Sequence, residues 1–370
     1  MKEVLKSDYA KILALFVIWK TFIFSTAYIS VKFIPIFGAK FPYYEETLIS
    51  TKLPHFIWSL GNFDGVHYLR IAQDGYVYQF TQAFFPFYPI LIKLVSYLTF
   101  GNFLIAALLI SNGAFLAGLL LFNKLVEKIY NQKIAFWACL FLIALPTSFY
   151  FGAVYTEGLF FLMIIGSFYL LERKKVFLAS IVGAFASATR LAGVFLAPSA
   201  IMTKNLKSLI PLLFIPLGLL IYIIYLKIEY NNPFYFLTAQ SIWGQERSTT
   251  EIVLLPQVLW RYIKILLTTK GLPLFNAMFE LSATLFAITL LILATKKVKR
   301  EWLIFSWLAV ITPTFTGTLA SMPRYILMAF PIYIVLAQIK STVIKFVILA
   351  IFIVLLATTT LLFTRGYWVA

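Results

Sequence analysis

The residues best suited to chemistry lie in one polar and aromatic stretch, residues 62–89 (NFDGVHYLRIAQDGYVYQFTQAFFPFYP), between long apolar segments. Asp64 is followed there by His67 and Tyr68. A carboxylate among aromatic rings at a membrane surface can take a proton from a hydroxyl group. Asp64 is therefore our candidate general base, with an ordinary loop aspartate as the alternative. His67 and Tyr68 either position an acceptor hydroxyl or belong to an aromatic belt at the interface.

Three charged residues in or beside apolar sequence are further candidates. Glu157 opens an apolar segment after Thr156, so it either faces a cavity or cation or helps to cap a helix. Arg190 lies inside apolar sequence (SATRLAG) and needs an anionic partner, either Glu157 or a lipid phosphate. Arg324 (SMPRY) is a cation at the end of an apolar segment, with snorkelling to the interface as the alternative.

Gln240 and Trp243 (AQSIWGQ) form either a sugar-binding platform or an interface anchor. Two motifs are missing from the sequence. There is no G-x-x-x-x-G-K-[ST] loop for ATP, and no Asp-x-Asp pair to hold a metal on a nucleotide sugar. A phosphate already anchored in lipid would need only Arg and Lys, so we expect neither a cofactor nor a metal.

The composition fixes the class of protein that must position these residues. Of 370 residues, 62% are hydrophobic and only 12% are charged, which indicates a polytopic all-α membrane protein. The net charge of +17 reflects basic loops on one side of the membrane rather than nucleic-acid binding. Cys139 is the only cysteine, so no disulfide can form within the chain.

The positive-inside rule favours a short interfacial helix over residues 86–100 instead of a span, because all basic loops then fall on one side. This layout predicts one integral-membrane domain, residues 1–370, with large outer segments at 35–101 and 227–271. It has eleven spans, a cytoplasmic N-terminus and an outer C-terminus. The expected spans are 10–34, 102–122, 134–151, 157–171, 176–188, 191–202, 208–226, 272–294, 302–317, 326–338 and 342–363.

A further helix is expected at 252–267, between two of these spans. Gln257, Arg261 and Lys264 recur at spacings of four and three residues. Such spacing places them on one face of an otherwise apolar helix. The helix is therefore suited to lying in the membrane interface.

Several motifs together resemble those of the PIG-V type mannosyltransferases. They are, in order, FDGVHYLRIAQDGY with AFFPFYP, YTEGLFF, ATRLAG, FLTAQSIWGQ, SMPRYIL and FTRGYWVA. The family has Trp-Asp where this chain has Phe63-Asp64, so the acid is kept and the indole N–H is lost. The resemblance implies a GT-C fold, a polyprenyl-phosphate sugar donor that is typically mannose, no metal, and Asp64 as the base. The short length resembles that of prokaryotic members.

From these observations we predict an inverting glycosyltransferase. Arg190, Arg324 or both would hold the donor phosphate, and Asp64 would deprotonate an acceptor hydroxyl on a glycolipid, glycan or protein. The site would face outward in the plasma membrane of a prokaryote or the endoplasmic reticulum of a eukaryote. A lipid or solute transporter, or flippase, is the alternative, although the sequence lacks the paired repeats that such proteins show. A purely structural membrane scaffold would leave Arg190 without a purpose.

Overall fold

The computed structural model describes residues 2–38, 41–201, 210–243, 247–248 and 251–369, and these ranges contain helices, turns and loops but no strand. Within them, five helical segments are long and apolar enough to cross a membrane. This agrees with the all-α polytopic GT-C fold expected from the sequence. The five segments are Tyr9–Phe33, Phe103–Ile129, Ile210–Tyr230, Leu272–Ala294 and Thr342–Thr364.

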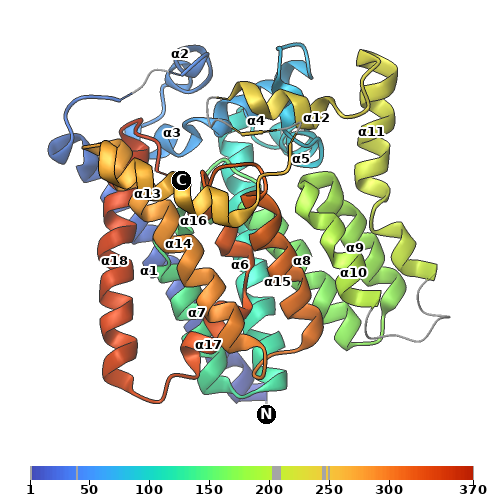
Figure 1. The fold of residues 1–370 in the computed structure, drawn as a ribbon, viewed down its shortest axis with the longest axis vertical. Coiled ribbons are helices and arrows are strands. Elements are labelled where there is room, and N and C mark those ends of the chain that lie inside the picture. The colour runs from blue at the N-terminus through green and yellow to red at the C-terminus, as the bar shows by residue number, and fades with distance from the viewer. Residues whose placement is uncertain (1, 39–40, 202–209, 244–246, 249–250, 370) are drawn as a thin grey trace. The chain divides into compact units, whose positions relative to one another are not determined.

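The chain divides into two compact units. Unit 1 comprises residues 1–75, 87–169 and 333–369. Two of its long helices, α1 (Lys2–Phe33) and α18 (Thr342–Thr364), pack side by side (Figure 1). Its other helices are α2 (Tyr44–Thr47), α3 (His55–Trp58), α4 (Asp64–Asp74), α5 (Phe87–Ser96), α6 (Phe103–Ile129), α7 (Gln132–Ala144), most of α8 (Glu157–Glu172) and most of α17 (Pro331–Ala337).

Local sequence sets where several unit 1 helices begin. The Asn102 side chain accepts from the Ile105 N–H at 3.0 Å, and that of Asn131 accepts from the Ile134 N–H at 2.9 Å. Each satisfies one of the first-turn N–H groups that have no partner within the helix. The same geometry recurs at α18, where Ser341 caps the Ile344 N–H at 3.3 Å.

The C-terminal end of α18 anchors the first loop of unit 1. Buried Arg365 donates from Nε to the Ile34 carbonyl and from Nη2 to the Pro35 carbonyl, both at 2.7 Å. Asn62 Nδ2 donates to the Phe363 carbonyl at 2.9 Å. The closing FTRGYWVA motif therefore fixes the chain on both sides of the loop that leads into Asp64.

Unit 2 comprises residues 76–86 and 170–332. Residues 76–86 pack on α11, where the Tyr222 hydroxyl donates to the Gln82 carbonyl at 2.7 Å and Phe85 joins Tyr222, Leu226 and Phe236 in one core cluster. The helices within this unit are α9 (Val176–Thr189), α10 (Leu196–Ile201), α11 (Leu217–Tyr230), α12 (Tyr235–Thr238), α13 (Leu255–Thr268), α14 (Leu272–Ala294), α15 (Arg300–Thr314) and α16 (Met322–Tyr325).

Among the expected spans, three are shortened or divided in the structure. The helix expected at 134–151 ends at Ala144, just before Leu145-Pro146, because the residue before a proline disfavours helical geometry. The expected span 326–338 is wrong as one helix, since a 3-10 turn (Ile326–Met328) precedes the seven-residue α17 that begins at Pro331. The expected 191–202 helix likewise starts as a 3-10 turn, Leu191–Phe195.

Some expected features lie outside the described residues. These are the beginning of the span expected at 208–226, the end of the one expected at 191–202, and Lys204 and Lys207. The total of eleven spans and the sidedness of the loops stay predictions. The helix expected in the interface before the second span is present as α5, which ends at Ser96.

Candidate active site

Asp64 is the first residue of α4. Its side chain is half-buried at the N-terminus of the helix, where the helix dipole favours a negative charge. Gly65 lets this turn pack against the chain before α8, because an added Cβ would come within 3.3 Å of the Val154 carbonyl oxygen. The Val154 N–H donates to the Leu60 carbonyl at 3.0 Å, so the chain before α8 also holds the segment that precedes α4.

Phe63, directly before Asp64, has an unusual backbone conformation with φ 58° and ψ −118°. A non-glycine residue with positive φ costs free energy, and such residues gather at functional sites where the surroundings hold them. Three rings hold this one: Phe41 at 4.8 Å, Trp368 at 5.1 Å and Phe363 at 5.7 Å between ring centroids. This aromatic cage fixes the turn that presents Asp64.

His67 and Tyr68 follow on the same helix, and both are buried. Burial lowers the pKa of His67 to about 4, and the nearby Asp64 charge opposes this only in part. The ring is therefore neutral at physiological pH and offers one hydrogen-bond donor and one acceptor. His67 is thus able to orient a hydroxyl group beside Asp64, as the sequence suggested, but not to act as a cation.

Glu157 is the first residue of α8 and is only 1% exposed. Glu157 and Tyr68 both interact electrostatically with Tyr88. The rings of Tyr68 and Tyr88 lie 5.3 Å apart. The Tyr155 hydroxyl donates to the Asn62 carbonyl at 3.0 Å. The structure therefore brings the FDGVHY and YTEG motifs into one polar and aromatic cluster in unit 1.

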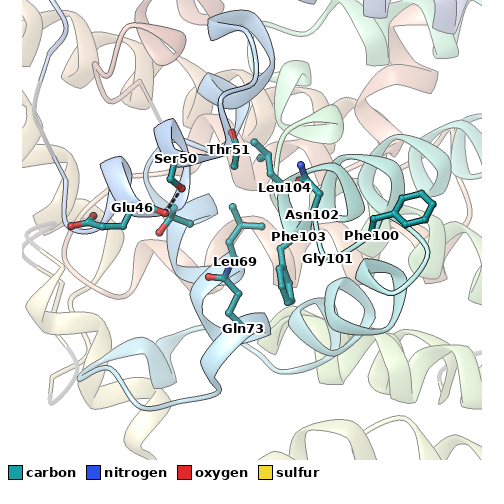
Figure 2. A pocket seen from close by; sticks show the side chains of 11 residues that line it. Glu46, Ser50, Thr51, Leu69, Gln73, Phe100, Gly101, Asn102, Phe103 and Leu104 are labelled. Carbon is teal, nitrogen blue, oxygen red and sulfur yellow. Dashed lines mark hydrogen bonds between the residues drawn. The ribbon is translucent and has the colours of Figure 1, made fainter.

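A pocket of about 280 Å³ opens beside α4 in the same unit (Figure 2). Its wall carries carboxylate, hydroxyl and amide groups over apolar side chains, and the Thr47 Oγ1 atom is buried without a hydrogen-bond partner. Such a lining can hydrogen-bond several hydroxyl groups. The polar lining residues are Glu46, Thr47, Ser50, Thr51, Gln73 and Asn102.

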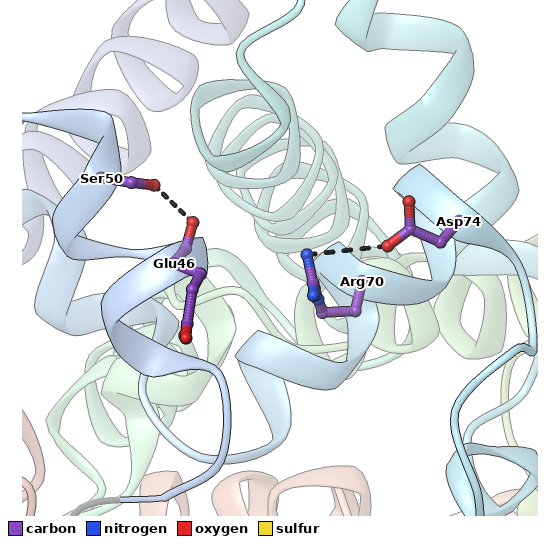
Figure 3. A network of polar contacts seen from close by, with 4 residues as sticks. All are labelled: Glu46, Ser50, Arg70 and Asp74. Carbon is purple, nitrogen blue, oxygen red and sulfur yellow. Dashed lines mark hydrogen bonds and ion pairs between the residues drawn. The ribbon is translucent and has the colours of Figure 1, made fainter.

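The far end of α4 is stabilised separately. Arg70 Nη1 lies 3.6 Å from Asp74 Oδ2, one helical turn away, while Ser50 donates to the Glu46 carbonyl on the neighbouring short helix (Figure 3). The guanidinium of Arg70 also lies 5.2 Å from the centre of the Tyr43 ring. Asp74 is thus a second carboxylate on α4, but it lies at the last residue of the helix and pairs with Arg70.

Unit 2 contains a cluster of three arginines around one phenol. The guanidinium carbons of Arg190, Arg247 and Arg324 lie 5.5, 5.6 and 5.8 Å from the centroid of the Tyr325 ring. Burial raises the pKa of Tyr325, but the charges of Arg247, Arg324 and Arg190 outweigh this effect and bring the pKa down to about 8. The surroundings of this ring therefore favour negative charge, and arginines suit a phosphate group.

Local backbone features place two of these arginines. Arg190 follows the end of α9 in extended conformation, φ −154° and ψ 148°, so it lies at a break between helices and not inside a continuous span. Gly193 allows the next turn to fold back, since a Cβ there would lie 2.3 Å from the Ala186 carbonyl carbon. Arg247 is held by its Nη2, which donates to the Ala320 carbonyl at 3.1 Å.

A buried carboxylate lies within reach of this cluster. Glu280, inside α14, accepts a short hydrogen bond from the Tyr262 hydroxyl of α13 and senses the charge of Arg247. The same hydroxyl accepts from the Leu319 N–H at 3.0 Å. Glu280 thereby links α13, α14 and the loop before α16, which carries Arg324.

Gln240 and Trp243 lie elsewhere in unit 2. The Trp243 Nε1–H donates to the Phe80 carbonyl at 3.3 Å, and its ring meets that of Phe84 edge to face at 5.6 Å. These contacts fix the Trp243 ring within unit 2, and its role as sugar platform or interface anchor stays a prediction. Gln240 is half-buried in the 3-10 turn Ala239–Ile242.

The structure groups the predicted residues into two sets. Asp64, His67, Tyr68 and Glu157 belong to unit 1, whereas Arg190 and Arg324 surround Tyr325 in unit 2. Arg247 and Glu280 were not predicted from the sequence. Glu280 had a usable signal, a lone carboxylate in an apolar run, which is costly in a membrane unless it has a function. Arg247 had none, because it lies in a polar loop where an arginine is ordinary.

The described parts of the two units contain the long apolar helices of a multi-span membrane protein, a carboxylate at the start of a helix, and a cluster of arginines. The family model described as "Mannosyltransferase (PIG-V)" matches residues 2–214, more than half of the chain. The chain belongs to the PIG-V mannosyltransferase family, which confirms the resemblance seen in its motifs. The matched range includes Asp64, His67, Tyr68, Glu157 and Arg190, while the remaining candidates lie beyond it.

Three of the similar proteins come from eukaryotes. The chain is 27% identical over 175 residues to "GPI mannosyltransferase 2" of Cryptococcus neoformans var. neoformans serotype D, covering 44% of this chain and 39% of that protein. It is 28% identical over 145 residues to the human "GPI alpha-1,6-mannosyltransferase 2", covering 36% and 29%. It is 29% identical over 130 residues to "GPI mannosyltransferase 2" of Drosophila pseudoobscura pseudoobscura, covering 32% of this chain and 28% of that protein. The matches thus span less than two fifths of each relative.

Proposed function

We propose that this protein is a mannosyltransferase that moves mannose from a polyprenyl-phosphate donor to an acceptor hydroxyl, with inversion at the anomeric carbon. The observation that carries the proposal is the arginine cluster of unit 2, which suits a phosphate without requiring a metal or a nucleotide. Family membership supports mannose as the sugar.

Each set of residues has one task in the proposed reaction. Asp64 accepts the proton of the acceptor hydroxyl as the hydroxyl oxygen attacks the anomeric carbon. The bond from that carbon to the phosphate oxygen breaks, and the polyprenyl phosphate leaves with the electron pair. Arg190, Arg247 and Arg324 stabilise the charge that grows on the leaving phosphate. Neutral His67 orients the acceptor, and the polar pocket on α4 is suited to its other hydroxyl groups.

We place this chemistry on the outer face of the membrane, because the basic loops of the sequence gather on the opposite side. The acceptor in this proposal is a glycolipid, glycan or protein that carries a free hydroxyl. The donor reaches the site laterally through the bilayer, with its polyprenyl chain among the helices.

Asp64→Asn tests the base directly. The amide keeps the size of the side chain but cannot take the proton, so transfer from polyprenyl-phosphate mannose falls by about 10²–10⁴ while donor binding stays near normal. Asp74→Asn is the matched control, because it changes a second carboxylate of α4 that pairs with Arg70 at the other end of the helix. Purified protein is assayed with candidate acceptors, and binding of polyprenyl phosphate is measured separately.

Three outcomes would contradict the proposal. Near-wild-type transfer by Asp64→Asn removes Asp64 as the base and makes Glu157 the next candidate. Use of GDP-mannose in place of the lipid donor contradicts the assignment of the arginine cluster. Loss of transfer in chelator reveals a required metal.

A further inference from the structure

We propose that unit 2 carries a separate binding site for the phosphate headgroup of an anionic membrane phospholipid, in a pocket beside α13. The pocket has a volume of about 310 Å³ and lies between α13 and the loop that precedes α16. Its lining includes Arg261 and Lys264 and contains neither Asp nor Glu. The site does not depend on the activity proposed above.

The helix α13 has three distinct stripes, which follow from its turn of about 100° per residue. Val258 and Tyr262 face the protein and are buried. Trp260, Ile263 and Leu267 form an exposed apolar stripe on the opposite side, with Leu267 81% exposed. The polar stripe, between the other two, consists of Gln257, Arg261, Lys264 and Thr268.

The length and contacts of α13 indicate a helix in the membrane surface. It has 14 residues, fewer than the roughly 20 that a membrane span needs, and is therefore only about 21 Å long. It packs across α14 (Figure 1). A surface helix of this kind buries its exposed apolar stripe among lipid chains and holds its cations at headgroup level. A lipid whose chains cover Trp260 would thus present its phosphate to the neighbouring cations.

The pocket is built by fixed backbone. The Ser248 N–H donates to the Thr316 carbonyl at 2.8 Å, and the Val253 N–H donates to the Phe315 carbonyl at 3.0 Å. Arg261 Nη1 donates to the Gly317 carbonyl at 3.3 Å, which holds one arm of the guanidinium. Gly317 has φ +85°, a conformation that a side chain would strain.

The second cation is held differently. Lys264 Nζ lies 5.5 Å from the centre of the Trp260 ring, so the ammonium group sits at the border between the polar and apolar stripes. This is the border at which a phospholipid carries its phosphate. The Ser248 hydroxyl in the lining accepts from the Glu251 N–H at 3.0 Å, and its proton can be donated to a phosphate oxygen.

The experiment uses full-length protein in phosphatidylcholine nanodiscs. The probe is phosphatidylglycerol with brominated acyl chains, which quenches tryptophan fluorescence on contact, and Trp260→Phe isolates the Trp260 signal by difference. We expect brominated phosphatidylglycerol to quench Trp260 more strongly than brominated phosphatidylcholine. Arg261→Gln with Lys264→Gln should lower the preference for the anionic lipid by about thirty-fold, because each cation contributes roughly fivefold.

The matched control is Lys296→Gln with Arg300→Gln, which removes the same charge from exposed positions that do not line the pocket. It should leave the preference unchanged, and all variants should keep the wild-type melting temperature. Equal quenching by both lipids, or by neither, would overturn the proposal. Displacement of the lipid by millimolar inorganic phosphate would assign the pocket to free phosphate. Displacement by polyprenyl phosphate but not polyprenol would assign it to the donor class, and would equally refute a phospholipid site.

Discussion

Replacing Arg190 by alanine should impair donor use far more than folding. Its guanidinium carbon lies 5.5 Å from the Tyr325 ring centroid, around which the three arginines of the proposed phosphate site gather. A unit negative charge at that distance interacts with Arg190 by about 3 kcal/mol at an effective dielectric constant of about 20. Losing this interaction in the transition state lowers donor kcat/KM roughly a hundred-fold.

The assay is mannose transfer at saturating acceptor with polyprenyl-phosphate mannose varied. Arg190→Lys keeps the charge but loses the planar fork, so it should recover activity only in part. Arg300→Ala is the matched control, because Arg300 is exposed at the start of α15 and makes the same change in net charge. A donor kcat/KM for Arg190→Ala that equals that of Arg300→Ala would remove Arg190 from the phosphate site.

Three other predictions can be tested with single variants. Since the Tyr325 phenol has a pKa of about 8, its ionised form should compete with the donor phosphate, and the donor KM should rise as pH passes through 8. Tyr325→Phe should abolish this rise in KM. A rise that persists in the variant refutes the prediction. Cysteine introduced at Gln79 should react with an impermeant reagent in intact cells and cysteine at Tyr130 should not, while native Cys139 is buried; the reverse pattern would invert the topology. Arg365→Lys should destabilise the fold by about 2–4 kcal/mol, measured as the free energy of unfolding, because two charged hydrogen bonds are lost; an unchanged value would contradict the anchoring role.

The sequence predicted best the helices whose limits are set locally. The expected helix at 272–294 has the same bounds as α14, and the one at 342–363 differs from α18 by one residue. Both are long apolar runs with a turn signal or cap at the start, and such signals are contained in the run itself. The failures, such as the expected span at 326–338, occur where prolines and 3-10 turns divide an apolar run into short pieces.

The candidate site could be predicted only residue by residue. The types and motifs pointed to Asp64, Glu157, Arg190 and Arg324, because polar groups in apolar sequence are few. Their grouping depends on contacts between segments far apart in the chain. The convergence of Arg190 with Arg247 on Tyr325 joins three segments that no local pattern connects.

The resemblance to the family implies a tryptophan where this chain has Phe63, and the contacts of this ring indicate what such a substitution would cost. The neighbours of this ring are the side chains of Phe41, Phe363 and Trp368, all aromatic. None of these three rings carries an acceptor that would lose a hydrogen bond when an indole N–H is absent at residue 63. The cost of having phenylalanine there is therefore mainly a loss of packing volume. The cage must still hold a positive φ at residue 63, and two of its three rings come from the C-terminal motif. That motif therefore helps to fix the turn from which the Asp64 side chain extends.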